Sequence, residues 1–191
     1  MATAGPNAPG TMADDAAVGT LTWANPDNAK TNNTAYATFN AGYSTAQSHY
    51  LKATNFGFAI PSGATIDGVS VSIERRTDRV SGTYGRTTVV KLVKGGTVSG
   101  DNKASATDWP DADAVASFGG VSDLWGLTLT DTDINDSTFG VVLSATITND
   151  EEMFLNIGYV DYISITITYT TGAPAGVPKQ MMHYAKMRKT R

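Results

Sequence analysis

The sequence ISITITYT at residues 163–170 places an apolar side chain at every second position, with a serine or threonine between them. A period of two puts the apolar side chains on one face of a β-strand and the polar ones on the other. The same alternation recurs at residues 69–73, 90–92 and 139–147. The pattern therefore predicts half-buried strands as the main structural element.

Clusters of turn-forming residues separate these segments. They lie at residues 61–63, 78–85, 95–96, 119–120 and 149–150, and glycine, proline, asparagine and aspartate in such clusters favour tight turns. Between them we find no apolar stripe of helical period longer than a turn or two. Short strands joined by turns predict an all-β fold, an antiparallel two-sheet β-sandwich of the jelly-roll type.

Composition divides the 191 residues into a central domain and two arms. Residues 1–17 are rich in Ala, Gly, Pro, Thr and Asp and predict an extended N-terminal arm. Residues 18–170 form the predicted sandwich, in which residues 98–124 are poor in strand signals and predict a long contact loop. The sequence TGAPAGVP at 171–178 breaks any strand, so residues 171–191 predict a C-terminal arm.

Charge is distributed unevenly between the domain and the C-terminal arm. The net charge of −4 divides into −9 for residues 1–170, with nine basic and 18 acidic residues, and +5 for residues 171–191. We interpret the basic arm as a segment that docks on an acidic protein neighbour, with a simple solvated tail as the alternative. Nucleic-acid binding is disfavoured because five positive charges on an acidic body make a poor general binder. The predicted partner-binding residues are Lys179, Met182, Tyr184, Lys186, Arg188, Lys189 and Arg191.

Motifs for catalysis and metal binding are missing from the sequence. The chain has no cysteine, which excludes disulfides, thiolate metal sites and a cysteine nucleophile. His49 and His183 are its two histidines, and neither belongs to a nucleophile motif. Residues 131–136 imitate a calcium loop but lack its glycine and its glutamate, which favours a polar turn with Ile134 pointing inward. We therefore expect no enzyme activity, no metal and no cofactor.

Aromatic residues offer one possible binding surface. Tyr43, Trp109 and Phe118 lie near predicted loops, where their rings would be able to stack on a sugar. The favoured alternative is that aromatic side chains fill the core and cover the sheet edges. No run of about 20 apolar residues and no secretory signal is seen, so we expect no membrane segment and synthesis in the cytoplasm.

One series of motifs resembles a known group of proteins. Residues 60–69 read IPSGATIDGV, and Trp109-Pro110, Trp125-Gly126 and Val160-Asp161-Tyr162 follow. Together they resemble β-sandwich structural proteins of tailed bacteriophages, among them capsid decoration proteins and modules of tail fibres. The resemblance covers about residues 20–170.

The resemblance implies a non-enzymatic protein of the virion. Most directly, it implies a decoration (cement) protein that binds and stabilises a phage capsid through its sandwich and its terminal arms. The implied partners are the major capsid protein or other virion proteins, together with further copies of the chain, a trimer being favoured. The alternative is a tail-fibre or spike module that binds host-surface carbohydrate.

Overall fold

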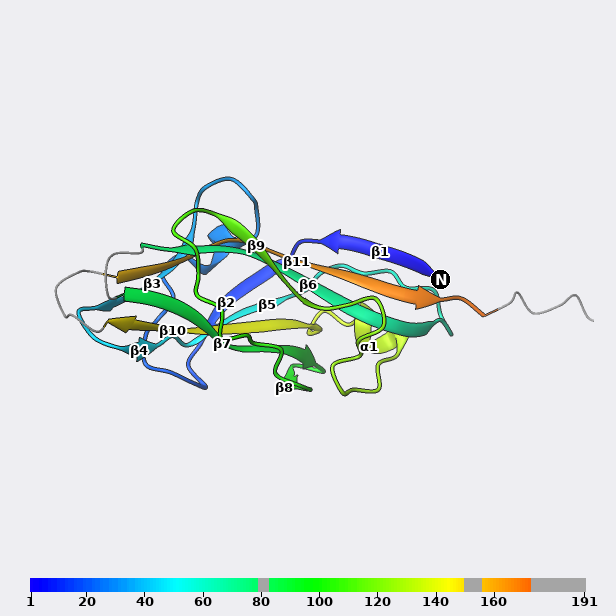
Figure 1. The fold of residues 1–191 in the computed structure, drawn as a ribbon. Coiled ribbons are helices and arrows are strands. Elements are labelled where there is room, and N and C mark those ends of the chain that lie inside the picture. Colours follow the sequence, from blue (N-terminus) through cyan, green and yellow to red (C-terminus); the bar gives the residue numbers. More distant parts are fainter. Residues whose placement is uncertain (79–82, 150–155, 173–191) are drawn as a thin grey trace, which may run out of the picture.

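The computed structural model describes residues 1–78, 83–149 and 156–172. In these ranges the chain forms two antiparallel β-sheets that pack face to face (Figure 1). The predicted all-β, two-sheet antiparallel fold is thus confirmed, while the jelly-roll connectivity stays a prediction. No helix in the described ranges is long and apolar enough to span a membrane.

The first sheet, sheet A, is organised around its central strand β11. The order is β1–β11–β6–β9, and β3 also pairs with β11. β6 pairs with β11 along most of its length, whereas β3 and β1 pair with the beginning and the end of β11. The strands are β1 (Ala2–Asn7), β3 (Ala37–Gly42), β6 (Thr65–Thr77), β9 (Ala114–Gly119) and β11 (Asn156–Thr170).

The second sheet, sheet B, has the order β2–β5–β10–β7–β8, with β4 also paired with β10. A 3-10 turn, η1 (Pro26–Ala29), and a short helix, α1 (Asp131–Asn135), lie outside the sheets. The strands are β2 (Thr11–Asp15), β4 (Ala46–Gln47), β5 (Tyr50–Thr54), β7 (Thr83–Lys94), β8 (Thr97–Ser99) and β10 (Gly140–Asn149).

Residues 1–17 do not form the predicted N-terminal arm. β1 pairs with the end of β11 in sheet A, and β2 pairs with all of β5 in sheet B. The Met12 side chain is buried in the core. The prediction was wrong because an edge strand is held by backbone hydrogen bonds to its neighbour, which need no apolar alternation of its own.

The alternating apolar residues meet between the sheets as one main core. Its fully buried members include Leu51, Ile73, Leu92, Leu143, Ile147, Ile163 and Ile165. Two further predictions concern connecting segments, namely residues 98–124 and residues 131–136. Residues 98–124 are not one long loop, because they contain β9. Ile134 is 1% exposed, which confirms the inward isoleucine, whereas the predicted polar turn is the short helix α1, which begins with a capping box of Thr130 and Asp133.

Candidate functional site

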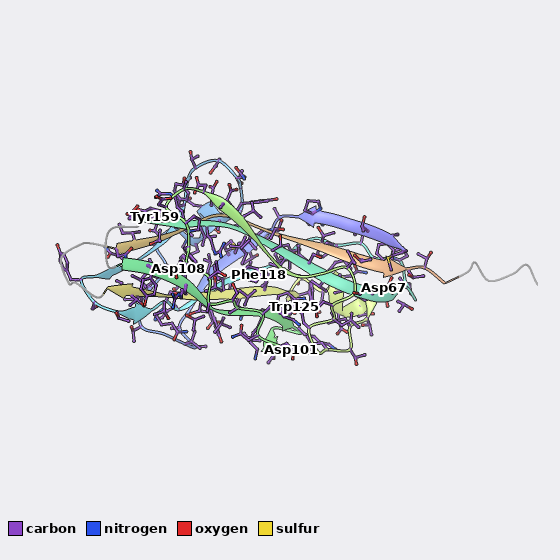
Figure 2. The ribbon with its side chains drawn as sticks, in the orientation of Figure 1. Asp67, Asp101, Asp108, Phe118, Trp125 and Tyr159 are labelled. Atoms are coloured by element: carbon purple, nitrogen blue, oxygen red, sulfur yellow. The ribbon has the colours of Figure 1, made fainter. Side chains whose placement is uncertain are left out.

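The residues predicted for carbohydrate contact do not form a surface. Trp109 is 0% and Phe118 is 6% exposed, and both belong to the core between the sheets. Figure 2 shows Phe118 among the strands. The Trp109 indole Nε1–H donates to the Thr87 hydroxyl at 3.0 Å. Tyr43 alone of the three is on the surface, with 53% exposure. The predicted three-residue platform was wrong, because Phe118 is an inward-facing residue of β9 and Trp109 turns into the core from the segment before it.

The residues predicted for partner binding lie outside the described residues. They are Lys179, Met182, Tyr184, Lys186, Arg188, Lys189 and Arg191. Their role therefore stays a prediction from the sequence.

His49, which directly precedes β5, makes a polar contact with Asp14 of β2. Its Nδ1 lies 2.9 Å from Asp14 Oδ2, and the other Asp14 oxygen accepts the backbone N–H of Trp23 at 2.8 Å. The Trp23 indole N–H in turn donates to the His49 carbonyl at 2.9 Å. These contacts give Asp14 and His49 a structural task, namely to hold residues 14–23 against sheet B.

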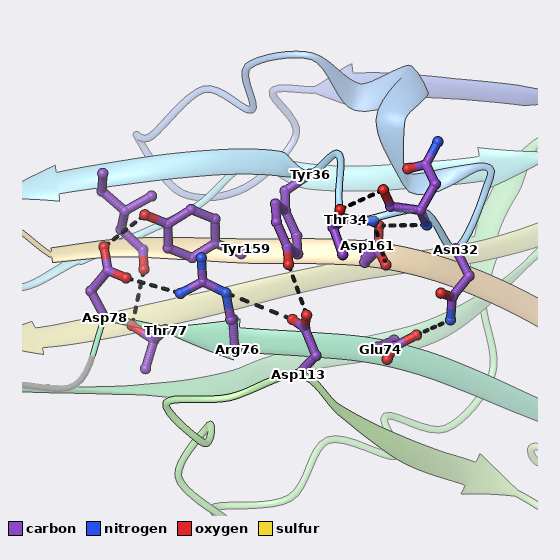
Figure 3. A network of polar contacts seen from close by, with 12 residues as sticks. Asn32, Thr34, Tyr36, Glu74, Arg76, Thr77, Asp78, Asp113, Tyr159 and Asp161 are labelled. Atoms are coloured by element: carbon purple, nitrogen blue, oxygen red, sulfur yellow. Dashed lines mark hydrogen bonds and ion pairs between the residues drawn. The ribbon is translucent and has the colours of Figure 1, made fainter.

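A network of aromatic and charged side chains covers part of the outer face of sheet A (Figure 3). Alternate residues of β6 point into the core, so the residues between them point outward. Outward-facing β6 side chains meet those of β11 and of the segments that precede β3 and β9. We call this set the Arg76 cluster, and its members are Tyr36, Glu74, Arg76, Asp78, Asp113, Tyr159 and Asp161.

Arg76 is held by two rings and two carboxylates. Its guanidinium carbon lies 3.9 Å from the Tyr159 ring centroid and 5.1 Å from that of Tyr36. Its nitrogens lie 3.0 Å from Asp78 Oδ1 and 3.7 Å from Asp113 Oδ1. Each carboxylate also accepts a tyrosine hydroxyl at 2.7 Å, Tyr36 on Asp113 and Tyr159 on Asp78. The guanidinium is thus fixed by cation–π and charged contacts together.

Both tyrosines remain hydrogen-bond donors over the physiological pH range. Burial, helped by the hydrogen bond to Asp78, raises the pKa of Tyr159 to about 12. The hydrogen bond to Asp113 is the main reason why the pKa of Tyr36 is also raised. Their hydroxyl protons therefore stay in place and keep the two carboxylates oriented toward Arg76.

A second part of the cluster ties residues 31–35 to sheet A. The Asp161 residue is 1% exposed, and its carboxylate accepts the backbone N–H groups of Asn33 at 3.3 Å and Thr34 at 3.2 Å. Glu74 accepts a hydrogen bond from the Asn32 side chain. Burial and the neighbouring carboxylates of Asp161 and Asp113 raise the pKa of Glu74.

The raised pKa of Glu74 predicts a pH-dependent effect of Glu74→Gln. A carboxyl whose folded pKa exceeds its unfolded value gives stability below the unfolded pKa, and this is lost as pH rises through the folded pKa. We expect Glu74→Gln to raise the melting temperature near pH 7 and to change it little below about pH 4, where the wild-type side chain is already neutral. Thermal melts over this pH range measure the difference.

Asp123→Asn is the matched control of opposite sign. Burial works to raise the pKa of Asp123, but Lys103 and the backbone N–H of Trp125 outweigh it, and the pKa is lowered. This substitution is therefore expected to lower the melting temperature near pH 7, with an effect that shrinks as pH falls through the folded pKa. If the melting temperatures of Glu74→Gln and Asp123→Asn changed with pH in the same way, the opposite pKa shifts of Glu74 and Asp123 would be contradicted.

The Arg76 cluster is built for positioning rather than for bond chemistry. Its donors and acceptors satisfy one another, and the contacts fasten residues 31–36 and 111–113 onto sheet A. No group of three or more His, Asp or Glu side chains able to hold a metal occurs in the described part of the chain. Sequence reasoning missed the cluster, although continuing the period of two beyond residues 69–73 would have put Glu74 and Arg76 on the outward face of the strand.

Comparison with known proteins gives no family. No family model matches the chain, and no curated protein matches it. Among solved structures, it is similar to the carbohydrate-binding module TmCBM61 in complex with β-1,4-galactotriose. The sequence identity is 9%, the alignment covers 81% of this chain and 86% of the module, and the TM-score is 0.36. At this TM-score the likeness carries no argument about function.

Proposed function

We propose that the chain is a non-enzymatic structural protein of a tailed-phage particle, a decoration protein that binds and stabilises the capsid as a homo-oligomer. The observation that carries the proposal is the separation of charge. Residues 1–170 carry −9, and residues 171–191, which follow directly on the end of β11, carry +5. A basic segment on an acidic body suits docking onto an acidic neighbour, because the opposite charges attract. Repulsion between acidic surfaces disfavours contacts in which the bodies of two copies meet through their acidic residues.

The scaffold supports the same proposal. Outside the Arg76 cluster, the outer face of sheet A is rich in hydroxyl side chains on its two central strands, together with the carboxylate of Asp67, which accepts a hydrogen bond from the Thr170 hydroxyl. Small neutral side chains allow close approach of neighbouring proteins on a crowded surface. Its partly exposed hydroxyl residues are Ser70, Ser72 and Thr166, whereas Ser164 and Thr168 are buried.

The residues that carry the phage resemblance are residues of the scaffold. Within 60–69, Ile60, Ile66 and Val69 are buried. The Ala64 N–H donates to the Pro61 carbonyl at 3.1 Å and closes the turn that leads into β6. The carbohydrate alternative loses two of its three predicted contacts through the burial of Trp109 and Phe118. Capsid decoration is therefore the function that we put forward.

The test is binding of the full chain to capsids assembled without it. We expect the triple substitution Lys186→Gln, Arg188→Gln and Lys189→Gln to weaken binding by about tenfold or more and to reduce its salt dependence. The matched control removes three positive charges from the body through Lys30→Gln, Arg86→Gln and Lys91→Gln, and should bind like the wild type. A wild-type protein that does not bind would end the proposal. Equal binding by the two triple variants would remove the role of the basic segment.

A further inference from the structure

Arg75 is a buried arginine that has an aromatic partner but no carboxylate partner. It occupies an inward position of β6 and is 5% exposed. Its guanidinium carbon lies 5.4 Å from the centroid of the Trp109 ring, and its Nε–H is buried without a hydrogen-bond acceptor. Burial lowers the pKa of Arg75 to about 10, and no neighbouring carboxylate counteracts this effect. The guanidinium is therefore charged at pH 7, and a charge in the interior is strongly unfavourable unless it is paired.

Asn156, at the beginning of β11, carries a second buried donor without an acceptor. The residue is 0% exposed, and its Oδ1 accepts the Thr77 hydroxyl at 2.9 Å, whereas its Nδ2 has no partner. Thr77 is the next inward-facing residue of β6 after Arg75, so both donors lie in the same region between the sheets. Among the described residues, Arg75 Nε and Asn156 Nδ2 are the buried side-chain polar atoms without a hydrogen bond. Both are donors, so the region lacks an acceptor.

Gly85 leaves space in this region. It is a buried residue of β7, in the opposite sheet, and brings no side chain to the interior. A Cβ at Gly85 would lie 3.6 Å from Thr77 Cβ and 3.6 Å from Trp109 Cγ. These are ordinary van der Waals distances, so a group of about the size of a methyl group fits there without displacing its neighbours. A halide ion has about this size, whereas a phosphate or an organic acid is larger.

We propose that the protein binds one small monovalent anion, chloride in physiological salt, between Arg75 and Asn156. The anion supplies the negative charge that the guanidinium lacks and accepts the N–H groups of both side chains. A water molecule in the same place would accept these hydrogen bonds but would leave the charge of Arg75 uncompensated. The anion thus joins the end of β6 to the beginning of β11 inside the core.

The test is the melting temperature of the full chain at pH 7 in sodium chloride and in sodium gluconate of equal ionic strength. An anion that binds the folded state alone stabilises it by mass action. We expect chloride at about ten times its Kd to raise the melting temperature by about 3–6 °C. Gluconate is also monovalent but too large for the space, so it should cause no such rise.

Arg75→Met and Arg76→Met are a matched pair of variants. Arg75→Met removes the buried charge and keeps an apolar side chain of similar length, so the rise with chloride should disappear. Arg76 is the next residue of the same strand but faces outward. Arg76→Met loses contacts of the Arg76 cluster, yet its melting temperature should still rise with chloride as in the wild type.

Asn156→Asp tests the site while Arg75 stays in place. The new carboxylate can still accept the Thr77 hydroxyl and supplies a negative charge from the chain itself, so the chloride dependence should be lost. Crystals grown in sodium bromide should show an anomalous scattering peak beside the Arg75 guanidinium.

Four results would overturn the proposal. They are a wild-type melting temperature that is the same in chloride and gluconate, a full chloride rise in Arg75→Met, a full chloride rise in Asn156→Asp, and bromide sites that lie on the surface alone. The bromide experiment and Asn156→Asp decide the matter if Arg75→Met does not fold. No capsid enters these measurements, so their outcome is independent of the proposed function.

Discussion

Trp109→Ala is expected to lower the free energy of unfolding by about 3–5 kcal/mol. The ring is fully buried, in edge contact with Phe39 at a centroid distance of 6.2 Å. Its loss also leaves the Thr87 hydroxyl without the indole donor. It removes the ring that faces the Arg75 guanidinium at 5.4 Å. Burial already lowers the pKa of Arg75 to about 10, which shows that its guanidinium is poorly solvated. Without the indole, this cation would border a cavity in place of an aromatic ring, which is unfavourable.

Denaturant unfolding of Trp109→Ala and Tyr43→Ala separates a core role from a ligand-contact role. Tyr43 is 53% exposed, and its truncation should change the free energy of unfolding by no more than about 0.5 kcal/mol. For Trp109→Ala, the expected loss corresponds to a fall in melting temperature of about 10 °C. A Trp109→Ala protein as stable as the wild type would show that burial of the Trp109 ring does not contribute to the free energy of unfolding as expected.

Gly140→Ala is expected to destabilise the protein by about 3 kcal/mol or more. A Cβ on Gly140 would lie 1.9 Å from the Ala53 carbonyl oxygen. Gly140 pairs with Thr54 on one side and Val93 on the other, so β10 cannot move away without breaking the centre of sheet B. The added methyl group must therefore break hydrogen bonds between β5 and β10. Thermal and denaturant unfolding measure the loss.

Gly120→Ala is the matched control for this prediction. A Cβ at Gly120 would meet no atom within 4 Å, and its backbone has no positive φ. Replacing this glycine reduces the entropy of the unfolded chain, so the expected effect is neutral or a gain of up to about 1 kcal/mol. Similar losses for both variants would argue against a steric origin at Gly140.

The strands of the sandwich were predictable wherever one face is buried. Residues 163–170 and 69–73 alternate because β11 and β6 pack one face on the core, and the structure confirms both strands. Arg75 follows Val71 and Ile73 at intervals of two and is 5% exposed, so the inward side of β6 extends to a charged residue that apolar alternation alone does not indicate. The local sequence thus predicts burial well, because burial favours an apolar residue at each inward position whatever the order of the strands.

Edge strands and the Arg76 cluster were not predictable for a different reason. Backbone pairing with strands remote in the sequence holds β1, β2 and β9 in place. The side-chain pattern of these strands therefore gives little indication of the pairing. The cluster joins Tyr36, Arg76, Asp113 and Tyr159, each from a different segment. Their meeting depends on strand order, which no local period contains.

The position of β11 has a consequence for biosynthesis. β11 lies between β6 and both β1 and β3, so until residues 156–170 have been made β1 and β3 lack their neighbour in sheet A and β6 has only β9 (Figure 1). A nascent chain that stops earlier holds the apolar faces of sheet A without their central strand. Sheet A therefore closes only after translation has passed β11, and we expect chains that end before this strand to fold incompletely and to be sensitive to proteolysis.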